Sequence, residues 1–156
     1  MKEELPILEK RRIQAEVLGP LFDEMVEKWG LNQASSILKD AIRKAAIQEG
    51  KYFREKSDSK TSIMENFIAL YELWKANGAL EMKVLHESKS QFDFNVTRCR
   101  YAEMYREMGL EKIGHLLSCN RDGTFCEGFE PNLKLVREQT LMEGASSCTF
   151  RYTLED

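Results

Sequence analysis

The chain has 156 residues, 42% of them hydrophobic and 31% charged, which is typical of one globular domain. Its longest unbroken apolar run, Phe67–Tyr71, is far shorter than the roughly 18 residues of a membrane span, so a transmembrane protein is excluded. The net charge of −3 provides no basic face, and we expect neither a nucleic-acid nor a membrane partner. No apolar segment of signal-peptide length follows the N-terminus, and we expect a cytoplasmic protein.

The three helices expected in the first half follow from apolar residues at helical spacing. The first has Leu18, Leu21, Phe22, Met25 and Trp29 on one face and stops at Gly30. The second covers residues 34–45. The third begins with a capping box, in which Ser62 and Glu65 satisfy free backbone amides, and ends at Asn77-Gly78.

After Gly78 the apolar period changes from 3.6 to 2, which predicts a hairpin of strands over residues 80–84 and 92–96. Two short helices follow, over residues 101–108 and 110–117. Beyond Ser118 we expect extended structure, with strands at residues 133–135 and 148–154.

The predicted fold class is therefore α+β, with N-terminal helices packed on an antiparallel sheet that a short helical pair interrupts. We expect one domain, residues 1–156, with a helical layer over about 1–78 and a sheet-containing, motif-bearing part over about 79–156.

The four cysteines, Cys99, Cys119, Cys126 and Cys148, all lie in the second half, and none forms a Cys-x-x-Cys pair. This pattern favours free thiols over a disulfide framework or a structural zinc site. The densest group of reactive side chains begins at Cys119, where a nearby cation would lower the thiol pKa and a carboxylate would relay a proton. The alternative is that Cys119 is a small buried apolar residue.

Three other positions each have a ligand-binding interpretation and a structural or surface one. The glycine next to Glu127 either lets the backbone approach a ligand or forms a turn beside a surface carboxylate. Arg137 and Arg151 either clamp a substrate carboxylate or lie at the surface. The run Lys10-Arg11-Arg12 is interpreted as a solvated face.

Taken in order, the motifs of residues 92–152 resemble the L-2-amino-thiazoline-4-carboxylic acid hydrolase family. They are Thr97–Tyr105, Gly109-Leu110, Cys119-Asn120-Arg121-Asp122, Glu127-Gly128-Phe129, Arg137, Thr140, Glu143-Gly144 and Cys148–Tyr152. One departure is Ser118, which precedes Cys119 where some relatives are expected to have a second cysteine.

This resemblance implies the hydrolytic opening of a small cyclic amidine that carries a carboxylate, such as L-2-amino-thiazoline-4-carboxylate, to N-carbamoyl-L-cysteine. Water adds at the ring carbon between nitrogen and sulfur, and the carbon–sulfur bond breaks. The catalytic residues implied are Cys119, Asp122 and Glu143, and the substrate-binding residues are Asn120, Glu127, Arg137 and Arg151.

Two routes are open for Cys119. Its thiolate attacks the ring carbon, or it holds a divalent metal ion that activates water, with Cys148 as a second candidate ligand. The substrate itself, metal dependence and assembly into a homo-oligomer stay open.

A second interpretation comes from the chain's last motifs. They are also similar to vinyl-reductase-type small-molecule-binding domains. On this alternative the protein is a non-catalytic module that binds a small molecule or a metal.

Overall fold

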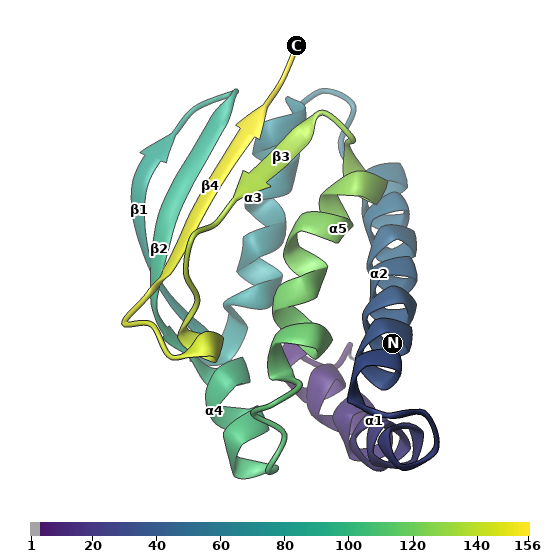
Figure 1. Cartoon of the computed structure of the whole chain (residues 1–156). Helices are drawn as coiled ribbons and strands as arrows, with labels where there is room; N and C mark the ends of the chain where they lie inside the picture. Colours follow the sequence, from purple (N-terminus) through teal and green to yellow (C-terminus); the bar gives the residue numbers. More distant parts are fainter. Residues whose placement is uncertain (1–3) are drawn as a thin grey trace.

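The protein is described by a computed structural model over residues 4–156, in which helices cover one face of a single antiparallel sheet (Figure 1). The first half forms α1 (Ile7–Trp29), α2 (Leu31–Lys56) and α3 (Ile63–Trp74), followed by β1 (Leu80–Glu87) and β2 (Gln91–Cys99). The second half contains α4 (Arg100–Glu107), the π-helical turn η2 (His115–Cys119), α5 (Asn120–Phe129), β3 (Leu133–Val136), the 3₁₀ turn η3 (Leu141–Glu143) and β4 (Cys148–Leu154). The predicted α+β class is confirmed.

The strand order is β1-β2-β4-β3, with every neighbouring pair antiparallel. The first two strands form the predicted hairpin, and β4 returns beside β2 so that Phe94 pairs with Phe150. Alternation places Phe92, Phe94, Val96, Cys148, Phe150 and Tyr152 on the inner face, where they pack against α3 and α5 in one aromatic-rich core.

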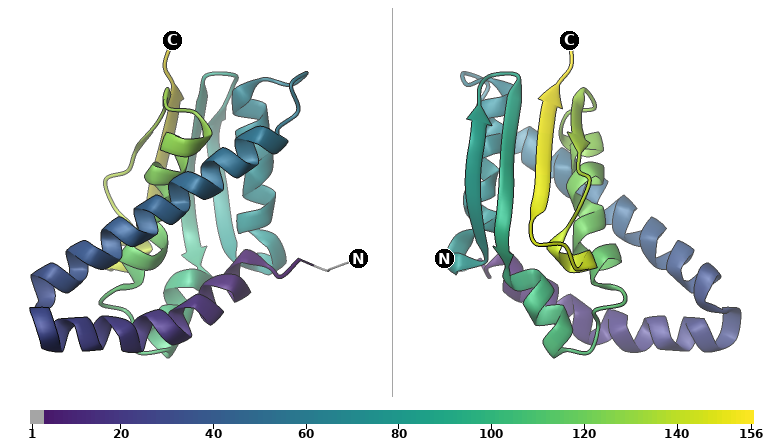
Figure 2. Two further views of the ribbon diagram at one scale, coloured as in Figure 1. Left: turned by 90° about the vertical axis from the view of Figure 1, so that its right-hand side faces the viewer. Right: turned by 60° about the vertical axis from the view of Figure 1, so that its left-hand side comes forward.

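The predicted capping box is present at the start of α3, where the Ser62 hydroxyl and the Glu65 carboxylate each accept a backbone amide. The predicted apolar face of α1 is only partly buried. Phe22 and Met25 are in the core, whereas Leu21 and Trp29 are exposed. The reason is that α1 and α2 form a long helical hairpin whose corner extends away from the sheet (Figure 2).

The prediction of extended structure beyond Ser118 is wrong, because η2 continues directly into α5 and the chain stays helical to Phe129. The glycines and polar residues of this stretch suggested a loop. In fact Gly128 lies against α2, where an added Cβ would come within 1.9 Å of the Ile47 carbonyl oxygen, and Gly50 meets Phe125 in the same way. These glycines therefore allow α2 and α5 to pack backbone to backbone.

None of the helices in the described part of the chain is both long enough and apolar enough to cross a membrane.

Candidate functional site

A cavity of about 80 Å³ lies between the inner face of the sheet and the helices, with lining residues from α1, α2, α3, α5 and three strands. This space holds several water-sized groups and is therefore of the right order for a small ligand. Its apolar wall includes the side chains of Phe67, Tyr71, Trp74, Phe125, Phe150 and Tyr152. Its polar wall consists of Arg11, Glu49, Cys119, Arg121, Asp122 and Arg137.

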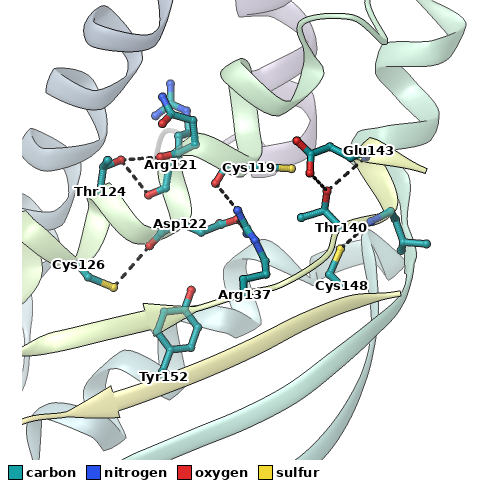
Figure 3. Close-up of polar contacts among 12 residues, drawn as sticks. Cys119, Arg121, Asp122, Thr124, Cys126, Arg137, Thr140, Glu143, Cys148 and Tyr152 are labelled. Atoms are coloured by element: carbon teal, nitrogen blue, oxygen red, sulfur yellow. Dashed lines mark hydrogen bonds and ion pairs between the residues drawn. The ribbon is translucent and has the colours of Figure 1, made fainter. Parts of the chain in front are cut away.

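Asp122 and Arg137 form an ion pair inside this cavity (Figure 3). Asp122 lies in the first turn of α5, and Arg137 comes directly after β3. Arg137 Nη1 donates to Asp122 Oδ2 at 2.5 Å, and Nη2 donates to the Cys119 carbonyl oxygen at 3.0 Å. The guanidinium also lies over the Phe150 ring, 4.9 Å from its centroid. The arginine is thus held from three sides.

The carboxyl group of Asp122 keeps part of its surface open, and this surface faces the cavity that it lines. Burial raises the pKa of Asp122 above its usual range, and the positive charge of Arg137 offsets part of that rise. A carboxylate with these properties is suited to general acid–base chemistry.

Cys119, at the end of η2, also lines the cavity. Burial raises the pKa of its thiol, and the charge of Asp122 adds to the rise, whereas Arg137 opposes both. This is the opposite of the lowering that the neighbouring arginines suggested in the sequence. The Cys119 side chain is therefore a protonated thiol at neutral pH.

The cavity contains a second group of charges that the sequence analysis missed, made up of Arg11, Glu49 and Arg121. Arg11 Nη2 and Arg121 Nη1 each lie 3.3 Å from the same oxygen, Glu49 Oε2. Only 7% of Arg11 is exposed, so its assignment to a solvated face was wrong. Its spacing from Ile7 and Ala15, four residues on either side, was the signal that it shares their buried helix face.

The other predicted site residues lie outside the cavity. Asn120 donates to the Lys39 carbonyl oxygen and so ties α5 to α2. Glu127 pairs with Arg43 at the surface. Glu143 is exposed, and its amide and carboxylate bond to Thr140, the N-cap of η3. Asn120 and Glu127 instead line a second, more open pocket together with Cys119 and Arg137, whereas Glu143 lines neither pocket.

Arg151 alternates with Phe150 and Tyr152 along β4 and therefore lies on the opposite face of the sheet. There it donates to the Phe94 and Phe150 carbonyl oxygens and to Asn95 Oδ1. Of the two arginines predicted to hold a carboxylate, only Arg137 reaches the cavity.

Cys148 lines the cavity as the predicted strand alternation requires, and its sulfur accepts a hydrogen bond from the Leu141 amide. Within residues 4–156, no three side chains of His, Cys, Asp or Glu are grouped as a metal site would need. A metal held by Cys119 and Cys148 would therefore lack a third protein ligand of these types in that part of the chain.

The model of the L-2-amino-thiazoline-4-carboxylic acid hydrolase family matches residues 10–152. The chain belongs to this family. The match confirms the resemblance and extends it from the C-terminal motifs into the helical half, so that it includes Arg11 and Glu49 as well as Asp122 and Arg137. No curated protein matches the chain.

Solved structures share the family member's fold at low sequence identity. The phenol-responsive sensory domain of the transcription activator PoxR, with phenol, has a TM-score of 0.58 and 12% identity over 88% of this chain and 73% of that one. A trafficking protein particle complex subunit 3 from Naegleria fowleri, covalently bound to palmitic acid, has a TM-score of 0.53 and 11% identity over 94% of this chain and 96% of that one.

Proposed function

We propose that this member of the family is a hydrolase that opens a small cyclic amidine carboxylate, such as L-2-amino-thiazoline-4-carboxylate, inside the cavity. The observation that carries the proposal is a carboxyl group with a raised pKa, Asp122, which lines a partly apolar cavity and is held by Arg137. Family membership supports a hydrolase, and the cavity volume suits a small ring.

In the proposed reaction, Asp122 takes a proton from water as the water oxygen bonds to the ring carbon between nitrogen and sulfur. Asp122 passes this proton to the ring nitrogen, whose bond to the carbon becomes single. The carbon–sulfur bond then breaks as the added hydroxyl group becomes the carbonyl of the product, and Asp122 carries the hydroxyl proton to the departing sulfur. One water is consumed, and N-carbamoyl-L-cysteine is formed. Arg137 keeps Asp122 in place and favours its ionised form at the start of the cycle.

This route differs from the two that the sequence left open. A thiolate route needs an ionised Cys119, and the raised pKa of that thiol opposes ionisation. We therefore assign Cys119 the role of a neutral thiol that contacts the bound ring, with Asp122 as the proton-transfer group.

The test follows release of free thiol from L-2-amino-thiazoline-4-carboxylate colorimetrically, with a blank for the four cysteines of the protein. We expect release by the wild-type protein and its loss in Asp122→Asn. Turnover that continues undiminished in Asp122→Asn would overturn the proposed mechanism. A parallel assay with chelator tests the metal route directly, because sensitivity to chelator would favour it.

The second candidate is a binding module without turnover. It is favoured by the aromatic wall of the cavity and by the likeness in fold to a phenol-responsive sensory domain. Thiol release and thermal stability together separate the candidates. A binding module would be stabilised against heat by the thiazoline but would release no thiol.

A further inference from the structure

The charges that line the cavity do not balance. Arg11, Arg121 and Arg137 face only two acidic side chains, Glu49 and Asp122, and no other lysine, arginine, histidine, aspartate or glutamate among the described residues lines this space. The carboxylate of Asp122 neutralises the charge of Arg137 in their ion pair. One positive charge in excess therefore belongs to the group formed by Arg11, Glu49 and Arg121, and an uncompensated charge away from bulk water is costly.

The hydrogen bonds of this group leave donors available. Both guanidinium groups bond to the same oxygen of Glu49, so neither forms a two-pronged pair with the carboxylate. Within the described chain, Arg11 Nε and Arg121 Nη2 have no hydrogen-bond acceptor, and neither nitrogen is completely buried, so both are open to a ligand. Burial, followed by the charge of Arg11, lowers the pKa of Arg121 to about 10, which is consistent with positive charge in excess.

Arg137 is a poorer partner for a ligand. Its terminal nitrogens donate to Asp122 and to the Cys119 carbonyl oxygen, just as those of Arg11 donate to Glu49 and Gln14. The difference is that the carboxylate of Asp122 neutralises the charge of Arg137. Its sequence-based role as a carboxylate clamp would place a second carboxylate beside that of Asp122, where the two negative charges would repel.

We propose that Arg11 and Arg121, held together by Glu49, form the subsite that binds the carboxylate of the substrate and selects anionic ligands. The identity of the probe rests on the proposed function, and the subsite itself rests on the charge excess and the available donors. A bound carboxylate neutralises the excess charge and accepts the unused guanidinium donors. The subsite joins α1, α2 and α5, so that recognition depends on the helical half as well as on the C-terminal motifs.

The first test needs no variant. L-2-amino-thiazoline-4-carboxylate and its neutral carboxamide are compared on the wild-type protein, by calorimetry if no thiol is released and by kcat/KM for thiol release if it is. Because one charged hydrogen-bonded contact is typically worth about tenfold or more in affinity, we expect the carboxylate to bind at least about tenfold more tightly. Equal affinity for the two compounds, or binding of neither, would overturn the proposal.

Two variants then assign the preference to residues. Arg121→Met should remove the preference for the carboxylate, because it removes the excess positive charge. Glu49→Gln should leave the preference intact or increase it, because it removes the carboxylate that competes for both arginines. If Glu49→Gln is folded and loses the preference as Arg121→Met does, Glu49 does not act as proposed and the subsite is refuted.

The matched control is Arg12→Met. Arg12 is adjacent to Arg11 on α1 but is exposed and pairs with Glu9 and Glu16, so its loss should change neither affinity nor preference. If Arg12→Met loses the preference for the carboxylate as fully as Arg121→Met does, the preference comes from the net charge of the protein and not from the subsite. If the protein prefers the carboxylate but releases no thiol, the subsite stands and the hydrolase proposal is refuted. If it releases thiol but shows no preference for the carboxylate, the hydrolase proposal stands and the subsite is refuted.

Discussion

Asp122, in the lining of the cavity, has two properties that suit a general base. Its pKa is raised by burial, and it is held in a fixed position by Arg137. A general base must be ionised to accept a proton, so a raised pKa makes its activity fall at a higher pH than that of an ordinary carboxylate.

At the residue scale, Asp122→Asn should therefore lower kcat by about 10²–10⁴-fold, the usual contribution of a general base. In the wild-type protein, kcat should fall as the pH decreases through the raised pKa of Asp122, because the group becomes protonated. The measurement is a pH profile of thiol release for both proteins. If the fall of kcat at low pH is unchanged in Asp122→Asn, a group other than Asp122 causes it.

Cys119 gives the complementary prediction. Because its thiol pKa is raised and the proposed proton transfers do not use it, Cys119→Ala should lower kcat by less than about tenfold, far less than the loss of a general base. The two variants are compared in the same thiol-release assay. If kcat falls as far in Cys119→Ala as in Asp122→Asn, the result would favour the covalent thiolate route.

At the scale of elements, the packing of α2 against α5 positions the site. Gly50 and Gly128 let the two backbones approach, and α5 carries Arg121 and Asp122 into the cavity while α2 carries Glu49. The close contact between these helices therefore aligns charges from distant parts of the sequence.

Gly128→Ala should destabilise the protein by about 1–3 kcal/mol or more, because its Cβ would overlap the Ile47 carbonyl oxygen. Gly123→Ala is the matched control in the same helix, since nothing lies within 4 Å of its added Cβ. It should instead stabilise by about 0.5–1 kcal/mol through helix propensity. Urea denaturation measures both, and equal effects of the two substitutions would contradict the packing argument.

At the scale of the whole molecule, all four cysteines are free and their thiols have raised pKa values. Burial is the main cause, and it takes the pKa of Cys99 to about 11 and that of Cys126 to about 12. In the unfolded chain these thiols ionise near pH ~8.5. Above that pH the unfolded state loses protons that the folded state keeps, so the unfolded state becomes more stable relative to the folded state.

The free energy of unfolding should therefore fall between about pH 8.5 and 9.5, below the range in which ordinary tyrosines ionise. This contribution is fully present below the unfolded pKa and is lost as the pH rises toward about 11 for Cys99. Urea titrations at several pH values measure the slope, and Cys99→Ala should make it shallower. A slope that is the same in this variant would show that the thiol does not contribute.

The sequence by itself determined the α+β class, the capping box of α3, the β1–β2 hairpin, the inward face of β4 and the family. These features depend on local spacing and on motifs that stand in order along the chain. It also placed Asp122 and Arg137 among the candidate residues, although their separation of fifteen positions hid that they form a pair.

Only the tertiary structure decided which polar residues share the cavity. Arg11, Glu49 and Arg121 come from three helices, and their meeting depends on the close contact of α2 and α5 at Gly50 and Gly128, the second of which lies in a stretch that was expected to be extended. Burial also reversed the expected effect on Cys119, because desolvation of the thiol outweighs the nearby positive charge. Local sequence records which side chains are available, whereas charge balance and desolvation arise only when distant segments enclose the same space.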